Sequence, residues 1–420
     1  MPRNHYEWKL GKPAPDLGRH SRAKHQIIDR YIRRYIDICT ATPVQEKLNL
    51  TIVDGFSGGG RYQLDGESIE GSPLILLRAI VEKEKELNAA RQKGFRIHTD
   101  FVFIDQNRYH TDYLRAEIEQ SEFANLLDNQ VKIWTADFNQ RVDDAIDVAA
   151  ARNQKGRSLF VLDQYGWSDV TFESIRRILR RLPKAEIFLT FLVDNLISYL
   201  SEDRLELEAF SRIEVDSGWL RELLAEKGEN AGWRTYIQNS LYKHIQEQTG
   251  AQFYSPFFIR SRDSNRSYWL LHLSRHREAR NEIGKIHWEE HNVSLHHGGA
   301  GLNALGFRPE TDGTLFLPGY DFDEQSRENS HQTLMSQVPD IIGEAVGAGG
   351  SMSLEDLFGT RCNDTPVTRD MFERALRELR SEGEIRIEDA YGREKPRSLS
   401  VQWSDRIMRP PQRTLFGPFG

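Results

Sequence analysis

The 420-residue chain contains only two cysteines, Cys39 and Cys362, which lie far apart in the sequence. Two such residues suggest neither a disulfide framework nor a zinc ribbon. Long apolar runs are also absent, since runs such as Ile187–Val193 fall well short of the roughly 20 residues that a membrane helix needs. The N-terminal stretch lacks the apolar core of a secretory signal. We therefore expect a cytoplasmic protein with no membrane partner.

The chain has no excess of positive charge: its formal net charge is −7 and its pI is about 6.1. This argues against broad, charge-driven binding to nucleic acid, but a local basic face remains compatible with it. Residues 30–35 and 174–184 mix basic and apolar side chains at helical spacing. We interpret both segments first as the solvated faces of amphipathic helices, with a nucleic-acid surface as the alternative.

Two common nucleotide-binding motifs are missing. The chain has no G-x-x-x-x-G-K-[ST] stretch, which argues against a P-loop kinase or ATPase. It has no G-x-G-x-x-G stretch that opens a helix, which argues against NAD binding. His296 and His297 have no further ligand in a metal-binding pattern, so we expect no metal site.

Between about residues 50 and 195, five strand-like apolar runs alternate with helical segments. Continuous apolar runs are typical of parallel strands that are buried on both faces. The alternation predicts a doubly wound α/β sheet. A helical insertion at about 200–250 and a β-hairpin at 253–276 follow, so the full prediction is a mostly parallel, seven-stranded sheet that ends in an antiparallel pair.

Composition and pattern divide the chain into four parts. Residues 1–45 form an N-terminal helical segment that packs on the core, and residues 46–325 form the α/β domain. Residues 335–405 show the order helix, helix, helix, hairpin, which is typical of a winged helix-turn-helix domain; residues 406–420 are a tail. Because the expected recognition helix mixes arginines with acidic residues, a protein partner fits it about as well as DNA or RNA.

Ligands of open α/β sheets bind beyond the carboxyl ends of the strands, so the residues after each strand are the candidate site. After the first strand, glycines would let the backbone approach a ligand closely. After the second, a carboxylate could hold two ribose hydroxyls. After the third, a carboxylate and a ring could contact an adenine amine and face. In this order the candidates are Asp54, Phe56, Ser57, Gly58, Gly59 and Gly60; Asp105; and Asp137 with Phe138.

The fourth strand ends in DQYGW, residues 163–167, which places a carboxylate and two aromatic rings on one loop. Each of the four strand-end signals is weak alone, but four in register are more specific. Together they predict a site for an adenosine-containing cofactor beside a pocket for a planar substrate. In the N-terminal helix, Lys24 and His25 could face the cofactor, but a surface position is at least as favoured.

FSGGG resembles the F-x-G-x-G signature of amino-methylating S-adenosylmethionine-dependent methyltransferases, and DQYGW resembles their D-P-P-[YFW] motif. Five parallel strands followed by a late hairpin match the class I methyltransferase sheet. The segments KHQIIDRYIRRY, IVDGFSGGGRY, EGSPLILL and YWLLHLSRH together resemble the three-Cys-motif partner protein (TcmP) family over about residues 20–300.

This resemblance implies S-adenosylmethionine as cofactor and a three-Cys-motif protein as partner. It also implies that Asp163 and the Gln164 carbonyl orient a target amine, while Tyr165 stacks on a base of DNA or RNA that is flipped from its helix. Gln164 and Gly166 replace the prolines of the motif, so the loop lacks their fixed φ angles. Trp167 offers an alternative aromatic wall.

The sequence hypothesis is thus a methyltransferase that acts on an amino group of a nucleic-acid base. Two alternatives stay open: a catalytically silent, cofactor-binding subunit of a multi-protein, defence-type system, and another nucleotide-handling enzyme on the same fold. Polar residues 61–71 delay the helix that begins at Ser72. We expect them to form a flap over the cofactor mouth, with Arg61 and Tyr62 nearest the ligand.

Overall fold

The computed structural model describes residues 6–152, 157–201, 208–229, 233–260, 267–289, 295–297, 319–345, 351–396 and 400–410. The chain divides into two compact units, which are considered one at a time. The first comprises Met1–Ile286 and Val293–Leu295, and the second comprises His287–Asn292 and His296–Gly420.

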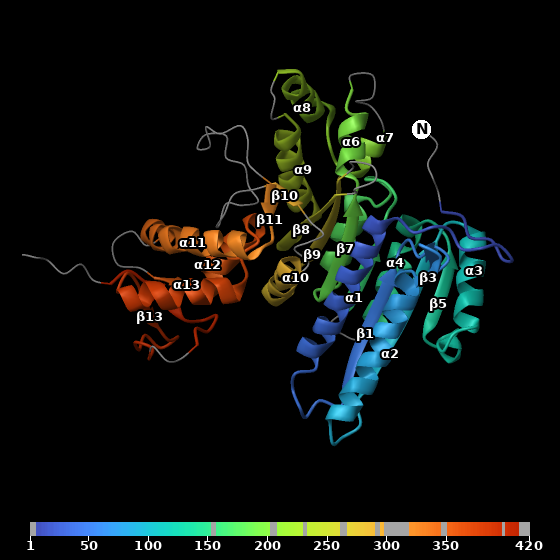
Figure 1. The fold of residues 1–420 in the computed structure, drawn as a ribbon, viewed down its shortest axis with the longest axis horizontal. Coiled ribbons are helices and arrows are strands. Elements are labelled where there is room, and N and C mark those ends of the chain that lie inside the picture. Colours follow the sequence, from blue (N-terminus) through green and yellow to red (C-terminus); the bar gives the residue numbers. More distant parts are fainter. Residues whose placement is uncertain are drawn as a thin grey trace, which may run out of the picture. The chain divides into compact units, whose positions relative to one another are not determined.

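Seven strands form the central sheet of the first unit, in the order β5-β4-β1-β6-β7-β9-β8 (Figure 1). They are β1 (Lys47–Asp54), β4 (Arg96–Asp105), β5 (Val131–Thr135), β6 (Ser158–Leu162), β7 (Ala185–Phe191), β8 (Phe253–Arg260) and β9 (Ser267–Ser274). The strands β5, β4, β1, β6 and β7 are parallel, whereas β9 is antiparallel to both β7 and β8. This confirms the predicted mostly parallel, seven-stranded sheet with an antiparallel end.

Helices cover both faces of this sheet, which is why its strands are apolar along their length. One hydrophobic cluster joins the sheet to α1 (Arg19–Cys39), α2 (Ser72–Ala90), α3 (Arg108–Glu119) and α10 (Arg277–Glu289). A short 3-10 helix, η1 (Ala124–Leu126), follows α3. On the other face, α4 (Phe138–Arg152) packs on β1 and β4, and α5 (Phe172–Arg181) packs on α4 and β7.

The predicted helical insertion lies between β7 and β8. It contains α6 (Val193–Tyr199), α7 (Glu208–Arg212), α8 (Ser217–Glu229) and α9 (Trp233–Thr249). Figure 1 shows these helices gathered at the end of the sheet where β7 leads into α6. α9 also packs on α5 and α6, so the insertion is part of the first unit.

The two basic segments carry ion-paired guanidinium groups. On α1, Arg33 pairs with Asp29 and Glu82. On α5, Arg177 pairs with Asp143, at 2.8 Å, and neighbouring arginines form similar pairs with acidic residues of the same unit. These contacts support the interpretation of both segments as solvated faces of amphipathic helices.

A short hairpin explains why the helix after β1 begins late. β2 (Arg61–Leu64) and β3 (Glu67–Glu70) pair with each other in antiparallel register. The amide of Gly71 donates to the carbonyl of Gly60 at 2.8 Å and closes the base of the hairpin. α2 then begins, with a proline in its first turn, where the missing N–H has no helical partner to lose.

The N-terminal segment, residues 6–18, lies along this hairpin, and we call it the strap. The amide of Leu17 donates to the Gln63 carbonyl at 2.7 Å, and the Gln63 amide donates to the Pro15 carbonyl at 2.9 Å. The indole nitrogen of Trp8 donates to the Arg61 carbonyl at 2.6 Å. The strap and the hairpin are therefore one hydrogen-bonded layer.

The buried Trp8 accounts for part of the glycine run after β1. A Cβ on Gly59 would lie 2.3 Å from the Trp8 ring, and a Cβ on Gly58 would lie 2.8 Å from it. Gly60 has a φ of +78°, and a Cβ there would lie 2.6 Å from Leu114 Cδ1. Packing within the protein thus already requires glycine at these positions.

The second unit contains three longer helices, α11 (Glu324–Ala345), α12 (Leu354–Arg361) and α13 (Arg369–Glu382), and a 3-10 turn, η3 (Cys362–Asp364). β12 (Met352–Ser353), β14 (Arg406–Met408) and β13 (Arg386–Glu388) form a three-stranded sheet in that order. β10 (Leu295–His297) and β11 (Gly319–Asp321) form a separate two-stranded ladder. The predicted winged-helix order is confirmed.

Residues Arg406–Met408, which the sequence analysis assigned to the tail, are the central strand of the wing sheet. Ile407 is fully buried and pairs with Met352 on one side and Ile387 on the other. A strand of three residues is too short to show an alternating pattern, so the sequence carries little signal for it. Residues 411–420 of the predicted tail lie outside the described residues.

The arginines of α13 contact residues of their own unit. Arg369 pairs with Glu373 at 2.8 Å and lies over the Trp403 ring, and Arg374 pairs with Glu328 at 2.9 Å. Arg380 is buried, and it donates to a backbone carbonyl at 3.3 Å. In this expected recognition helix, Arg369 and Arg374 are therefore ion-paired within their own unit, and Arg380 is buried.

The contact between Trp8 and the glycine loop gives a stability prediction. Gly59→Ala should lower the free energy of unfolding by about 1–3 kcal/mol, because the new Cβ overlaps the buried indole. Trp8→Ala should cost about 3–5 kcal/mol by itself. The double variant should cost clearly less than the sum, because the overlap is gone. Urea unfolding measures the free energy of unfolding of the two single variants and the double variant. Additive losses would contradict the contact between Trp8 and Gly59. Gly94→Ala is the control, because a Cβ at Gly94 would have no tight neighbour.

Candidate functional site

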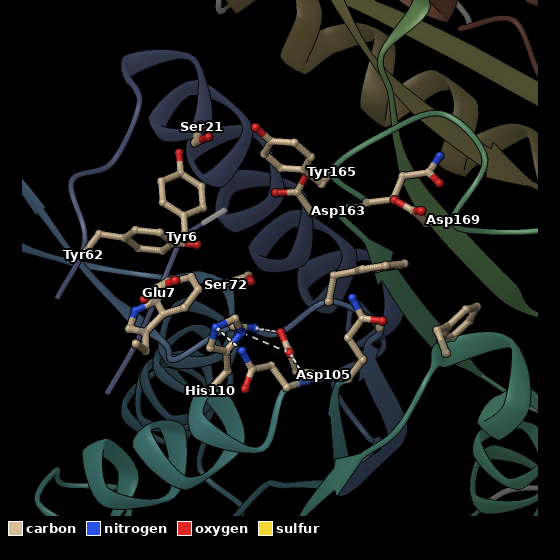
Figure 2. A pocket seen from close by; sticks show the side chains of 18 of the residues that line it. Tyr6, Glu7, Ser21, Tyr62, Ser72, Asp105, His110, Asp163, Tyr165 and Asp169 are labelled. Carbon is tan, nitrogen blue, oxygen red and sulfur yellow. Dashed lines mark hydrogen bonds and ion pairs between the residues drawn. The ribbon is translucent and has the colours of Figure 1, made fainter. Parts of the chain in front are cut away.

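A cavity of about 780 Å³ lies beyond the carboxyl ends of the parallel strands (Figure 2). The loops after β1, β4, β5 and β6 contribute to its wall, and the strap and the start of α1 complete it. Its volume falls in the range of about 300–1,000 Å³ that is typical of small-molecule sites. The edge of the sheet is also where ligands of open α/β folds bind.

Nine of the predicted site residues line this cavity. Those predicted to contact the cofactor are Phe56, Gly58, Asp105, Asp137 and Phe138, with Tyr62 of the flap; those predicted to contact the substrate are Asp163, Gln164 and Tyr165. Figure 2 shows Asp105 with His110 on one side of the cavity and Asp163 with Tyr165 on the other. The structure thus brings both predicted halves of the site together.

The other predicted residues are not part of the lining. Ser57 donates to the Ile104 carbonyl through its amide and its hydroxyl, at 2.9 and 3.2 Å, and so ties the loop after β1 to β4. Gly59 and Gly60 are covered by the strap and α3. Arg61 points its guanidinium at Glu117, at 2.5 Å, so of the two flap residues only Tyr62 reaches the cavity.

Asp54 is fully buried beneath the loop after β1 and does not line the cavity. One of its carboxylate oxygens accepts a hydrogen bond from the Phe56 amide at 3.1 Å. Burial raises the pKa of Asp54 to about 7, against the lowering effect of hydrogen bonds from Ser72 and Phe56. Asp54 therefore stabilises the conformation of the loop after β1 through this hydrogen bond.

Asp105 joins two loops at the end of β4. Its carboxylate accepts from the Gly58 amide at 3.0 Å and from the Asn107 amide at 2.8 Å, and it lies 3.1 Å from His110 Nδ1. An ionised carboxylate can accept about four hydrogen bonds. Asp105 therefore keeps capacity for a ligand hydroxyl, while it also holds the glycine loop in place.

Asp137 caps the start of α4, where one of its oxygens accepts from the Asn139 amide at 2.9 Å. The next residue, Phe138, is buried against the backbone of the loop after β1, because a Cβ on Gly55 would lie 2.8 Å from its ring. The rings of Phe56 and Phe138 have centroids 6.2 Å apart. This part of the wall combines an acceptor with two flat apolar faces.

The sequence analysis left two positions open for Lys24, facing the cofactor or at the surface; in the structure the side chain is buried and lines the cavity. Its ammonium nitrogen lies 2.5 Å from Asp163 Oδ1. Burial would raise the pKa of Asp163, but the charge and hydrogen bond of Lys24 outweigh it and hold that pKa below its usual value. The loop of residues 163–167, which we call the acceptor loop, thus takes part in an ion pair that its sequence motif did not reveal.

His25 is buried next to this ion pair. Burial is the main reason that its pKa is lowered to about 4, while the Asp163 carboxylate opposes the shift and the Lys24 ammonium adds to it. Its Nδ1 atom has no hydrogen-bond partner among the described residues. At neutral pH, His25 is therefore uncharged.

Gln164 and Trp167 take different directions from the same loop. Gln164 is buried and lines the cavity, and its side-chain oxygen accepts from the Val170 amide at 2.9 Å. Trp167 is buried against Phe210, with ring centroids 5.0 Å apart, and does not line the cavity. The aromatic wall offered as an alternative is thus not present; Tyr165, which is 40% exposed, is the aromatic residue of this loop at the cavity.

The contribution of the strap could not be seen in the sequence. Tyr6, Trp8 and Tyr62 form a cluster with ring centroids 5.1–5.8 Å apart along one side of the cavity. Trp8 also contacts the His110 ring, at 4.8 Å. Tyr62 and His110 are more than 50 positions away from Tyr6 and Trp8, so no local pattern could predict that these rings meet.

No group of three or more His, Cys, Asp or Glu side chains in the described part of the chain is arranged to hold a metal ion. None of the described helices is long and apolar enough to cross a membrane.

The Lys24–Asp163 pair predicts a charge-dependent loss of stability. Lys24→Met should lower the free energy of unfolding by about 1–3 kcal/mol, because it leaves a partly buried carboxylate without its counter-ion. Lys24→Met with Asp163→Asn should recover at least half of that loss. Lys83→Met is the matched control, since Lys83 is similarly buried but pairs with the half-exposed Asp37 and Glu86. Equal losses in both single variants, measured by urea unfolding, would count against the pair.

His25 predicts part of the acid sensitivity. An unfolded histidine binds a proton near pH 6.5, whereas folded His25 does so only near pH 4. Between these values the unfolded chain binds more protons, so the free energy of unfolding falls as pH falls, by up to about 1.4 kcal/mol per pH unit. Asp54, with its pKa raised to about 7, acts in the opposite direction. His25→Gln, compared with the parent at pH 7, 6 and 5, should show a shallower fall; parallel curves would refute this role of His25.

One protein-family model matches a segment of the second unit. The model of the GMT-like wHTH domain family matches residues 306–392. No curated protein matches the sequence. The comparisons do not name the three-Cys-motif partner family, so that part of the resemblance remains a prediction.

Solved structures similar to this chain include a protein from Legionella pneumophila, at 11% identity and a TM-score of 0.32, which covers 62% of this chain and 90% of that protein. A candidate S-adenosyl-L-methionine-dependent methyltransferase from Methanococcus maripaludis has 13% identity, a TM-score of 0.26, and coverage of 63% and 97%. The candidate methyltransferase YhhF from Escherichia coli has 13% identity, a TM-score of 0.25, and coverage of 65% and 100%.

These values are too low for the neighbours to indicate a function. The strand order of the sheet and the match to the second unit stand independently of them. The first unit has a mostly parallel, seven-stranded α/β sheet with an antiparallel end, and residues 306–392 are similar to the GMT-like wHTH domain family.

Proposed function

We propose that this protein is an S-adenosylmethionine-dependent methyltransferase. The observation that carries the proposal is that the glycine loop, Asp105, Asp137 and residues 163–165 meet at one cavity, at the carboxyl ends of the parallel strands. The fold alone would not fix a function. The position and chemistry of the strand-end residues support this one.

The residues at the cavity fit the cofactor. Asp105 retains acceptor capacity for ribose hydroxyls, and Asp137 with Phe138 offers an acceptor and a flat face for adenine. Phe56 and Gly58 would lie along the methionine part. When bound, the cofactor supplies a methyl group on a positively charged sulfur. The contribution of the chain is to hold this methyl group in line with the acceptor atom.

The resemblance points to an amino group of a nucleic-acid base as the acceptor, and to a three-Cys-motif protein as partner. Tyr165, at the cavity and partly exposed, supports a planar acceptor. The ion pair favours an amine less than the motif alone does, because the amine would have to share the Asp163 carboxylate with Lys24. The paired arginines of α13 likewise leave a protein partner as well supported as DNA or RNA for the winged helix.

A second candidate is a cofactor-binding subunit that transfers no methyl group itself. The same ion pair favours it, since Lys24 occupies one oxygen of the carboxylate that would orient the target amine in the amino-methyltransferase motif. Cofactor binding is common to both candidates, so methyl transfer to a substrate separates them.

Calorimetric titration tests cofactor binding. The full chain should bind S-adenosylmethionine and S-adenosylhomocysteine, and Asp105→Asn should weaken binding at least about tenfold by removing a charged acceptor for the ribose. Asp128→Asn is the control, because Asp128 precedes β5 and thus lies near the amino ends of the parallel strands, whereas the cavity lies at their carboxyl ends. If the folded parent protein binds neither ligand at about 1 mM, the proposal is overturned.

A further inference from the structure

We propose that the acceptor half of the cavity binds an anionic oxygen, namely the ionised hydroxyl or carboxyl group of a planar substrate, between Lys24 and the side-chain amide of Gln164. This inference rests on the proposed methyltransferase function and names the chemical class of its acceptor. It assigns to Lys24 and Gln164 a binding role that the amino-methyltransferase motif does not contain.

Lys24 supplies a positive charge at the cavity wall. Its side chain is 7% exposed, and Asp163 is its one hydrogen-bond partner among the described residues. An ammonium group carries three donors, so two N–H groups remain. A buried charge with unused donors is stabilised by an additional acceptor, and an anionic oxygen is the acceptor that makes the strongest hydrogen bond with it.

Gln164 supplies a second donor whose orientation is fixed. The backbone N–H of Val170 can only donate, so the group that it meets at 2.9 Å must be the side-chain oxygen of Gln164. The NH₂ group consequently points away from Val170, is buried, and has no partner among the described residues. A buried amide donor without a partner is destabilising, and a ligand oxygen at the cavity would supply the missing acceptor.

An amine acceptor fits these two donors poorly. The lone pair that must attack the methyl carbon would meet N–H groups, and the amine would have to share the Asp163 carboxylate with Lys24, which donates to Oδ1 at 2.5 Å. An oxyanion has several lone pairs. It can accept from Lys24 and Gln164 and still present one lone pair to the methyl group.

The transfer balances without another reactant. The acceptor loses its proton to solvent on ionisation, and Lys24 favours that ionised form. The acceptor oxygen then gains a bond to the methyl carbon as the bond from that carbon to sulfur breaks. The electrons of the broken bond stay on sulfur, so the positive charge of the sulfonium and the negative charge of the oxygen disappear together.

Tyr165 and Tyr6 limit the shape of the substrate. Both line the cavity (Figure 2), and Tyr6 packs edge-on against Tyr62, with ring centroids 5.2 Å apart. Aromatic side chains at a cavity wall favour a flat, apolar body. The substrate class is thus a planar organic acid whose acidic oxygen reaches Lys24.

A pair of near-isosteric probes tests this assignment. 4-Nitrophenol ionises to a coloured phenolate, whereas 4-nitroaniline offers a neutral amine on the same ring. Spectrophotometric titration of the full chain, with and without S-adenosylhomocysteine, should show that the bound nitrophenol is shifted toward phenolate. 4-Nitrophenol should also bind at least about tenfold more tightly than 4-nitroaniline, as expected for hydrogen bonds to a charged oxygen.

Variants locate the effect. Lys24→Met with Asp163→Asn removes both charges of the pair together, and should abolish the preference for phenolate. Gln164→Leu should reduce phenolate affinity by about three- to tenfold without affecting the Lys24–Asp163 pair. Lys83→Met, which removes a lysine outside the cavity, should change neither probe.

Equal affinity of the parent protein for both probes, or an unchanged preference in both cavity variants, would overturn the acceptor assignment. Because the probes are titrated with and without S-adenosylhomocysteine, this failure is separate from that of the proposed function. If the parent protein does not bind the cofactor, the methyltransferase proposal fails. The preference for phenolate would still show whether Lys24 and Gln164 bind an anionic oxygen.

Discussion

Parallel strands that end at one edge of a sheet are the constraint on which the functional half of this protein depends. The right-handed connections of a doubly wound fold return every strand to the same direction, so the residues that follow β1, β4, β5 and β6 meet at one place. Positions as far apart as Gly58 and Asp163 then line one cavity. The chemistry of the site follows from what each strand end carries to this edge.

The strap adds a second layer to that edge. Trp8 occupies the space that side chains at Gly58 and Gly59 would need, and it binds the Arg61 carbonyl. A glycine loop that would conventionally be assigned to a ligand is thus also required by protein packing. Among the glycines of this loop, Gly58 is the one that both meets Trp8 and lines the cavity. Asp105 connects the two roles, because it holds the Gly58 amide while part of its carboxylate faces the cavity.

The balance of charge at the acceptor loop distinguishes this site from the motif that it resembles. Amino-methyltransferases use the carboxylate of the loop as an acceptor for the substrate, whereas here Asp163 accepts from Lys24 of α1. Replacing the first proline of the motif by Gln164 adds a buried amide donor. Both features add a hydrogen-bond donor near Asp163: the ammonium group of Lys24 and the side-chain amide of Gln164.

The sequence by itself determined the fold, because buried parallel strands and amphipathic helices leave periodic patterns that are local in the chain. It also identified strand-end residues that line the cavity, such as Asp105, Asp137 and Asp163, because the position of a residue just after a strand is a local property. Only the tertiary structure decided which of the candidates remain available to a ligand. Asp54 and Trp167 are buried elsewhere, Arg61 is held by Glu117, and Lys24 enters from a helix almost 140 residues away. Such ion pairs and ring contacts join segments that are distant in sequence, and no local pattern records them.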